Sequence, residues 1–278
     1  MAILFAALSS LVYGSADFVG GIVARRNHGV VVALVSQIFG LATLVIALAV
    51  WPHVHVTVDD LGWGLLAGVG GGGGLALFYP ALAKGPMSIV APLTALLSAV
   101  IPMVVGFATG DRPSAVALTG ALLALPAIVL VARESGSHGK IALSTVLDCL
   151  GASAGFGLFY VALSRTSTHA GLWPLAAARI ASLSVLGGLC LAARRSPRPS
   201  PGSLSVIAGV GVFDMAANAL YLLAATRGLL SLVSVVGALY PAVTVVCAVI
   251  FLRERLLGAQ LIGLVLAGVA VSLVAVGA

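Results

Sequence analysis

Charged residues are scarce in this chain of 278 residues: Asp, Glu, Lys and Arg together make up 8% of it, and hydrophobic residues make up 61%. A soluble domain normally carries about 25% charged residues. So few charges cannot cover a water-facing surface, which excludes a soluble protein of this length. The composition instead predicts an integral membrane protein.

Cysteine is also rare, and the three cysteines stand far apart in apolar stretches. Cys149, Cys190 and Cys247 show no disulfide-like or ligand-like spacing, so we expect small buried residues. Histidines and aspartates, which can bind metals, occur close together at 53–55 and 59–60, but these positions fall in an expected loop. No metal site and no cofactor are therefore predicted.

Basic runs interleaved with aromatic residues are absent, although the net charge is +6. In membrane proteins, Lys and Arg mark cytoplasmic loops and lipid headgroup contacts. We therefore expect membrane lipid as a partner and no nucleic acid. Residues 1–21 are apolar without a basic start, which indicates a first spanning helix and not a cleavable signal peptide.

Long apolar runs fill the chain. A spanning helix needs about 20 mostly apolar residues, and short polar stretches divide the sequence into segments of that length. Pro113 is expected to be the first residue of its helix. The sequence predicts an all-α membrane protein of ten transmembrane helices: 2–22, 30–50, 61–83, 87–108, 113–132, 142–163, 170–193, 203–225, 230–251 and 256–277.

The chain repeats itself after about 143 residues. Residues 76–100 align with 219–243 without a gap, and ten positions are identical. We therefore predict two five-helix repeats, 1–135 and 141–278. Because each holds an odd number of spans, the second repeat is inverted, as in secondary transporters with a substrate site near the midplane.

The loop charges predict an orientation. Odd-numbered loops hold about ten Lys and Arg residues and even-numbered loops about three. Cytoplasmic loops carry the excess of positive charge. We therefore expect a multi-pass protein of the cell membrane with both termini outside.

Five consecutive glycines, Gly70 to Gly74, lie inside the expected third span. They match a dinucleotide-binding pattern, but the preceding strand and the later acidic residue that this motif needs are missing. In lipid the run stays helical, because unsatisfied backbone costs several kcal/mol per group. Gly70, Gly71 and Gly74 then either shape a cavity for a substrate or allow close helix packing.

Polar residues share one face of the expected eighth span: Asp214, Asn218 and Tyr221 follow at i, i+4 and i+7. An ionisable group inside a span usually faces a cavity or a partner. We predict that this face and Phe78, the repeat counterpart of Tyr221, line a substrate pathway. The alternative is a structural Asp–Asn hydrogen bond between helices.

Asp17 lies in the first span about one turn after Tyr13, and its repeat counterpart is Tyr160. Burial disfavours the charged form of a carboxyl group, so substrate and proton could compete for Asp17. The alternative is an interfacial pair with Arg25 or Arg26.

Arg179 and several prolines also interrupt expected spans. For Arg179 we expect snorkelling to the headgroups, with pairing to a buried carboxylate or an anionic substrate as the alternative. Pro92, Pro102 and Pro241 remove helical hydrogen bonds and permit kinks. These kinks are candidates for gates.

The chain resembles the EamA type of the drug/metabolite transporter superfamily. The resemblance covers nearly the whole chain, and its most recognisable piece is a small-residue helix after an acidic-basic turn. The matching stretches include YGSADFVGG (13–21), GDRPSAVALTGALLALPAIVLVA (110–132) and LRERLLGAQLIGLVLAGVAVSLVAV (252–276). It implies a cavity between the halves, lined by spans 1, 3, 4, 6, 8 and 9, with span 7 and Arg179 peripheral.

The resemblance implies a secondary transporter and not an enzyme. We expect it to move a small metabolite, amino-acid-like solute or drug by alternating access, as an exporter, with protons coupled through Asp17 or Asp214. It would act as a monomer or homodimer. A lipid-intermediate flippase on the same fold is the main alternative. A membrane-embedded enzyme would need a catalytic cluster that the sequence does not show.

Overall fold

The computed structural model describes residues 1–24, 26–27, 29–50, 55–84, 87–131, 142–194, 198–253 and 257–278. These residues form α-helices, one short 3-10 helix, η1 (Thr168–Ala170), and no strand. The helices are α1 (Ala2–Ala24), α2 (Gly29–Val50), α3 (Val58–Lys84), α4 (Met87–Ala108), α5 (Ala115–Val131), α6 (Leu143–Ser164), α7 (Trp173–Ala192), α8 (Leu204–Ala225), α9 (Leu230–Gly237), α10 (Tyr240–Leu252) and α11 (Gly258–Gly277).

The helices reproduce the ten expected spans. Eight segments are long and apolar enough to cross a membrane, with α9 and α10 counted together, and α4 and α5 contribute two shorter apolar helices. No boundary differs from its expected position by more than three residues. The prediction of an all-α membrane protein with ten transmembrane helices is confirmed.

One predicted helix start is wrong. Pro113 precedes α5, which begins at Ala115. Ser114 caps this helix, because its hydroxyl accepts a hydrogen bond from the backbone N–H of Ala117 at 3.1 Å. A side-chain cap of this kind satisfies an amide that would otherwise lack a partner at the helix start.

The ninth span is divided into two helices. α9 ends at Gly237 and α10 begins at Tyr240, and Pro241 occupies the first turn of α10, where no intrahelical N–H is needed. The interruption expected at Pro241 is thus a break between two helices. By contrast, α4 is continuous through positions 92 and 102.

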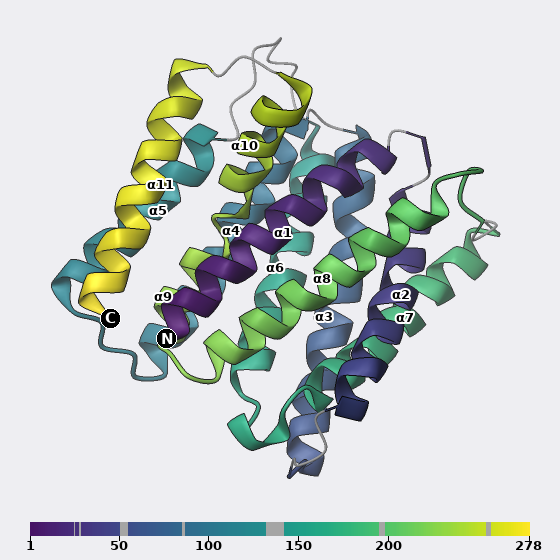
Figure 1. Cartoon of the computed structure of the whole chain (residues 1–278), viewed down its shortest axis with the longest axis horizontal. Coiled ribbons are helices and arrows are strands. Elements are labelled where there is room, and N and C mark those ends of the chain that lie inside the picture. Colours follow the sequence, from purple (N-terminus) through teal and green to yellow (C-terminus); the bar gives the residue numbers. More distant parts are fainter. Residues whose placement is uncertain are drawn as a thin grey trace.

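The helix contacts follow a pattern that exchanges the two halves. α1 packs on α8 as α6 packs on α3, and α2 packs on α8 as α7 packs on α3. Figure 1 shows α5 with α11 at one side of the bundle and α2 with α7 at the other. A two-fold relation between inverted halves would produce this pattern. The join between the predicted repeats 1–135 and 141–278 lies outside the described residues, so these boundaries stay a prediction.

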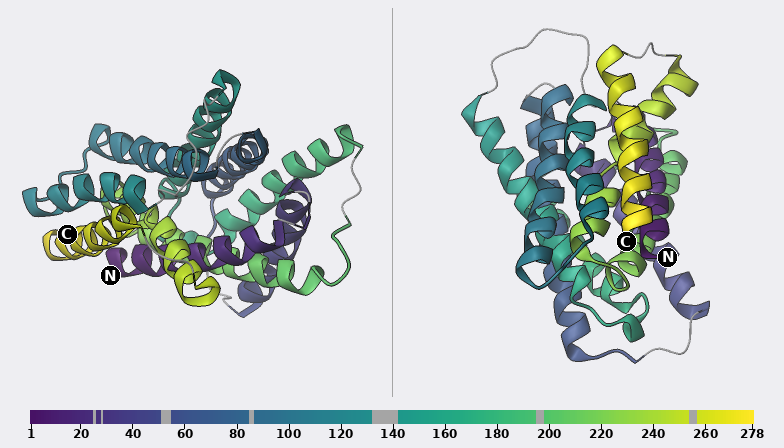
Figure 2. Two further views of the ribbon diagram at one scale, coloured as in Figure 1. Left: turned by 90° about the horizontal axis from the view of Figure 1, so that it is seen from above. Right: turned by 90° about the vertical axis from the view of Figure 1, so that its left-hand side faces the viewer.

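The two ends of the chain lie close together. Figure 1 and both views of Figure 2 place the start of α1 beside the end of α11. An even number of membrane crossings brings both ends to one side, as the ten-span prediction requires.

The glycine run packs α3 between α6 and α7. A Cβ atom at Gly70 would lie 2.7 Å from the carbonyl oxygen of Gly155 on α6, and one at Gly72 would lie 3.0 Å from Cα of Ser182 on α7. At Gly73 nothing lies within 4 Å. Glycine lets the backbones of α3, α6 and α7 approach this closely.

The same packing favours close helix packing as the role of the glycines. A Cβ atom at Gly71 would lie 3.1 Å from the ring of Phe159, and one at Gly74 would lie 2.7 Å from the ring of Phe156. Gly70, Gly71 and Gly74 therefore face α6 at contact distance. Their role in shaping a substrate cavity stays a prediction.

Two carboxylates of the first half accept hydrogen bonds from backbone N–H groups of the second half. Asp60, in the first turn of α3 and 3% exposed, accepts hydrogen bonds from the backbone N–H groups of Thr57 at 3.0 Å and Ser167 at 2.7 Å. Asp111, after α4, accepts one at 2.8 Å from the N–H of Ser231 in α9. Asp60 was expected in a loop; because Thr57 and Asp60 cap the helix reciprocally, α3 begins earlier, at Val58.

Candidate functional site

Asp17 is a carboxylate that has no counter-ion among the described residues. Its side chain is exposed, and it makes no hydrogen bond or ion pair with any other described residue, Arg26 included. Arg25 lies outside the described residues. Electrostatic interactions instead connect Asp17 with Asp214 on α8, Tyr160 on α6 and Tyr240 on α10.

Tyrosines from both halves gather around this carboxylate. The rings of Tyr13 on α1 and Tyr240 on α10 have centroids 6.4 Å apart, and those of Tyr160 and Tyr221 are 4.5 Å apart. Tyr160 also interacts electrostatically with Tyr13 and Tyr240. We call Asp17, Asp214 and these four tyrosines the carboxylate–tyrosine cluster.

One member of the cluster carries an unsatisfied polar atom. Tyr221 is 1% exposed, and its hydroxyl has no hydrogen-bond partner among the described residues. A buried hydroxyl without a partner costs free energy. The Tyr221 hydroxyl is therefore available to a ligand or a water molecule.

Asp214 has a counter-ion. Its carboxylate forms an ion pair with Arg179 on α7, and the side chains are 30% and 6% exposed. The prediction that Arg179 snorkels to the headgroups is wrong, because the guanidinium finds a carboxylate at depth. The guanidinium passes over α2 at Gly40, where a Cβ atom would lie 3.4 Å from its central carbon.

Asn218 does not join two helices. Its side-chain nitrogen donates to the backbone carbonyl of Asp214 at 2.7 Å, one turn earlier on α8. The alternative of an Asp–Asn hydrogen bond between helices is therefore wrong. Near Arg179, the hydroxyl of Ser182 donates to the side-chain oxygen of Gln37 at 2.9 Å and adds a polar contact between α7 and α2.

Phe78 packs against α6 and the neighbouring apolar residues. Its ring contacts Phe156 of α6 with centroids 5.9 Å apart, and it packs against the buried residues Ala81, Val90 and Cys149. Of the predicted pathway residues, the structure brings together Tyr13, Asp17, Tyr160, Asp214 and Tyr221.

Tyr240 is the cluster residue that the sequence analysis missed. It begins α10 directly after the break in the ninth span, where Thr244 donates to the carbonyl of Gly14 on α1 at 3.0 Å. The available signal was its position immediately before Pro241. A tyrosine next to a helix break inside a span lies where backbone groups are free to meet a ligand.

Comparison with known proteins identifies the second half of the chain. The model of the EamA-like transporter family matches residues 143–276. These residues resemble an EamA-like transporter domain. The description of that family is one of transporters. Together with the long apolar helices, the match indicates a multi-pass membrane protein.

Solved structures extend the likeness to the whole fold. Twenty-nine of their chains match, and one, described as "Crystal structure of protein", superposes with a TM-score of 0.76 at 21% identity. The match covers 98% of this chain and 95% of the other. At this identity the likeness shows the fold alone. No curated protein matches the chain in sequence.

Proposed function

We propose that this transporter moves a small cationic or zwitterionic solute, such as an amino-acid-like metabolite or a drug, by alternating access of its two halves. The observation that carries the proposal is Asp17, an exposed carboxylate with no counter-ion among the described residues, which interacts with tyrosines of α1, α6 and α10. Helices of both halves contribute to this cluster, as a site at the repeat interface requires.

The charges of the cluster favour a cation. Arg179 neutralises Asp214, so Asp17 contributes the uncompensated charge among these three residues. Aromatic faces attract cations, by about 0.5–1 kcal/mol at exposed sites and more when desolvated. An ammonium group can meet Asp17 and the tyrosine rings together.

Proton coupling would use the same carboxylate. Asp17 and Asp214 were both candidates from the sequence, and the ion pair with Arg179 makes Asp17 the better one, since a proton on Asp214 would break that pair. A proton on Asp17 would compete directly with a cationic solute. In such an exchange, a proton that enters the cell would displace the cationic solute from Asp17 and drive its export across the cell membrane. We place the odd-numbered loops in the cytoplasm.

Flux measurements test the proposal. Protein in lipid vesicles is screened with radiolabelled cationic, zwitterionic and anionic metabolites, with and without a pH gradient. We expect cation or zwitterion uptake that responds to the gradient, and Asp17→Asn is expected to abolish the response. Asp59→Asn is the matched control, because Asp59 is an exposed carboxylate at the start of α3.

Two outcomes would contradict the proposal. If Asp17→Asn retains both flux and pH response, the cluster is not the transport site. If no solute moves but labelled lipid crosses the bilayer, the flippase alternative describes the protein better. Asp214→Asn is compared in parallel, with flux normalised to folded protein because this change also breaks an ion pair.

A further inference from the structure

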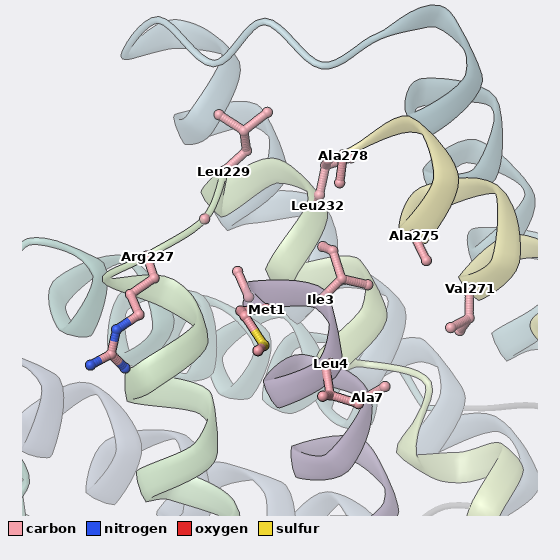
Figure 3. Close-up of a pocket in the computed structure, with 12 residues that line it drawn as sticks. Met1, Ile3, Leu4, Ala7, Arg227, Leu229, Leu232, Val271, Ala275 and Ala278 are labelled. Carbon is pink, nitrogen blue, oxygen red and sulfur yellow. The ribbon is translucent and has the colours of Figure 1, made fainter.

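A cavity that no residue of the carboxylate–tyrosine cluster lines lies near the ends of α1 and α11. It has a volume of about 660 Å³ and is bordered by the first two turns of α1, the α8–α9 loop and the last two turns of α11 (Figure 3). α1 packs mainly on α8, α9 and α10, whereas α11 packs mainly on α5. The cavity occupies the boundary between α1 and α11, where these helices make little contact.

The lining side chains are apolar except for that of Arg227, and the terminal residues Met1 and Ala278 also border the cavity. Leu4, Ala7, Leu232 and Val271 line it, and Arg227 supplies its one charged side chain (Figure 3). No acidic side chain borders the cavity. Its chemistry is that of a site for an amphiphile with an anionic end.

Arg227 is available to an anion. It is exposed and forms no ion pair with the described residues. Among the described residues its guanidinium donates one hydrogen bond, to the carbonyl of Leu223, which is long at 3.5 Å, and the guanidinium carbon lies 5.9 Å from the ring centre of Phe5. These contacts orient the guanidinium without neutralising its charge.

The position of Arg227 matches the depth of lipid headgroups. It stands between the end of α8 at Ala225 and the start of α9 at Leu230, and spanning helices end where the headgroups begin. Ala7 and Val271 lie about two turns into their helices from the same boundary. The cavity therefore has its charge at the headgroup level and its apolar wall within the hydrocarbon.

We propose that this cavity binds an anionic phospholipid of the surrounding bilayer. Arg227 holds the phosphate, and an acyl chain lies against Leu4, Ala7 and Val271. The volume is within the range of about 300–1,000 Å³ that is typical of ligand sites. The lipid would join α1 to α11 and thereby stabilise the contact between the two halves. The inference does not depend on which solute the protein carries.

Lipid-dependent unfolding tests the site. The purified full chain is titrated with phosphatidylglycerol or phosphatidylcholine, and its thermal unfolding midpoint is followed. We expect phosphatidylglycerol to raise the midpoint more than phosphatidylcholine. Arg227→Gln is expected to weaken phosphatidylglycerol binding about tenfold, as the loss of a charged hydrogen bond implies.

A matched control distinguishes the site from general surface charge. Arg165 is equally exposed at the end of α6, outside the cavity, so Arg165→Gln should keep the response. Ala275→Trp should reduce it by filling the cavity while retaining Arg227. Equal effects of the two lipids, an equal loss in Arg165→Gln, or an unchanged response in either Arg227→Gln or Ala275→Trp would overturn the proposal.

Discussion

Arg179 of α7 forms an ion pair with Asp214 of α8 across the surface of α2. A Cβ atom at Gly40 would lie 3.4 Å from the central carbon of the guanidinium, an ordinary contact distance. α8 approaches α2 much more closely at Gly211, where an added Cβ atom would clash with the carbonyl oxygen of Ser36. Three helices from the two halves thus meet at a buried charge pair.

Breaking this pair should destabilise the fold. Arg179→Ala leaves Asp214 without its counter-ion, and Asp214→Asn leaves the more deeply buried Arg179 unpaired. We expect each change to lower the free energy of unfolding by about 3 kcal/mol, the lower end for buried pairs, because Asp214 is 30% exposed. Chemical unfolding in detergent measures this. The double variant Arg179→Met/Asp214→Leu should recover most of the loss, and purely additive losses would contradict the pairing.

The glycine run offers a matched pair of substitutions. Gly70→Ala places a methyl group 2.7 Å from the carbonyl oxygen of Gly155, and overpacking of this kind costs about 1–3 kcal/mol. Gly73→Ala meets open space and should stabilise the helix by up to about 1 kcal/mol. The thermal unfolding midpoint should fall in Gly70→Ala and rise in Gly73→Ala. Equal midpoints for the two variants would argue against the packing of α3 on α6.

Asp60 should contribute to stability far more than its neighbour. Asp60→Ala removes the acceptor for the N–H groups of Thr57 and Ser167, and we expect a loss of about 2 kcal/mol. Asp59 is exposed, so Asp59→Ala should change stability by no more than about 0.5 kcal/mol. Comparable unfolding midpoints for the two variants would show that the α3 cap does not join the halves.

Asp111 should protect the first turn of α9. Asp111→Ala removes the acceptor for the amide of Ser231, which is 1% exposed, at a cost of about 1 kcal/mol. Hydrogen exchange of α9 should accelerate at Ser231 in this variant. Asp111→Asn keeps an acceptor oxygen and should show a smaller increase; no change in either variant would contradict the contact.

Most of the fold could be predicted because each membrane-spanning helix is specified by the hydrophobicity of its own stretch of sequence. Each span is an apolar run long enough to cross the hydrocarbon, and every expected run became a helix or, in the ninth span, two helices. The small errors fall at helix starts. There, side chains such as Ser114 and Asp60 cap the helix, and a hydropathy pattern does not predict such capping hydrogen bonds.

The candidate site was only partly predictable. Asp17, Tyr13 and Asp214 stand out because polar groups inside apolar spans are expensive. Tyr240 and the role of Arg179 did not stand out, since each depends on a partner from another helix. Asp214 and Arg179 are 35 residues apart in sequence, and hydropathy does not indicate which of the available charges will meet.

The sequence by itself determined the membrane-spanning class, the number of spans and the presence of costly polar groups within them. The reason is that whether a segment spans the bilayer depends mainly on the hydrophobicity of its own 20 or so residues. The tertiary structure alone decided that Arg179 neutralises Asp214, that no described residue forms an ion pair with Asp17, and that the glycines face neighbouring helices at contact distance. The physical reason is that pairing and packing depend on the order and close approach of helices, which contacts between distant segments establish.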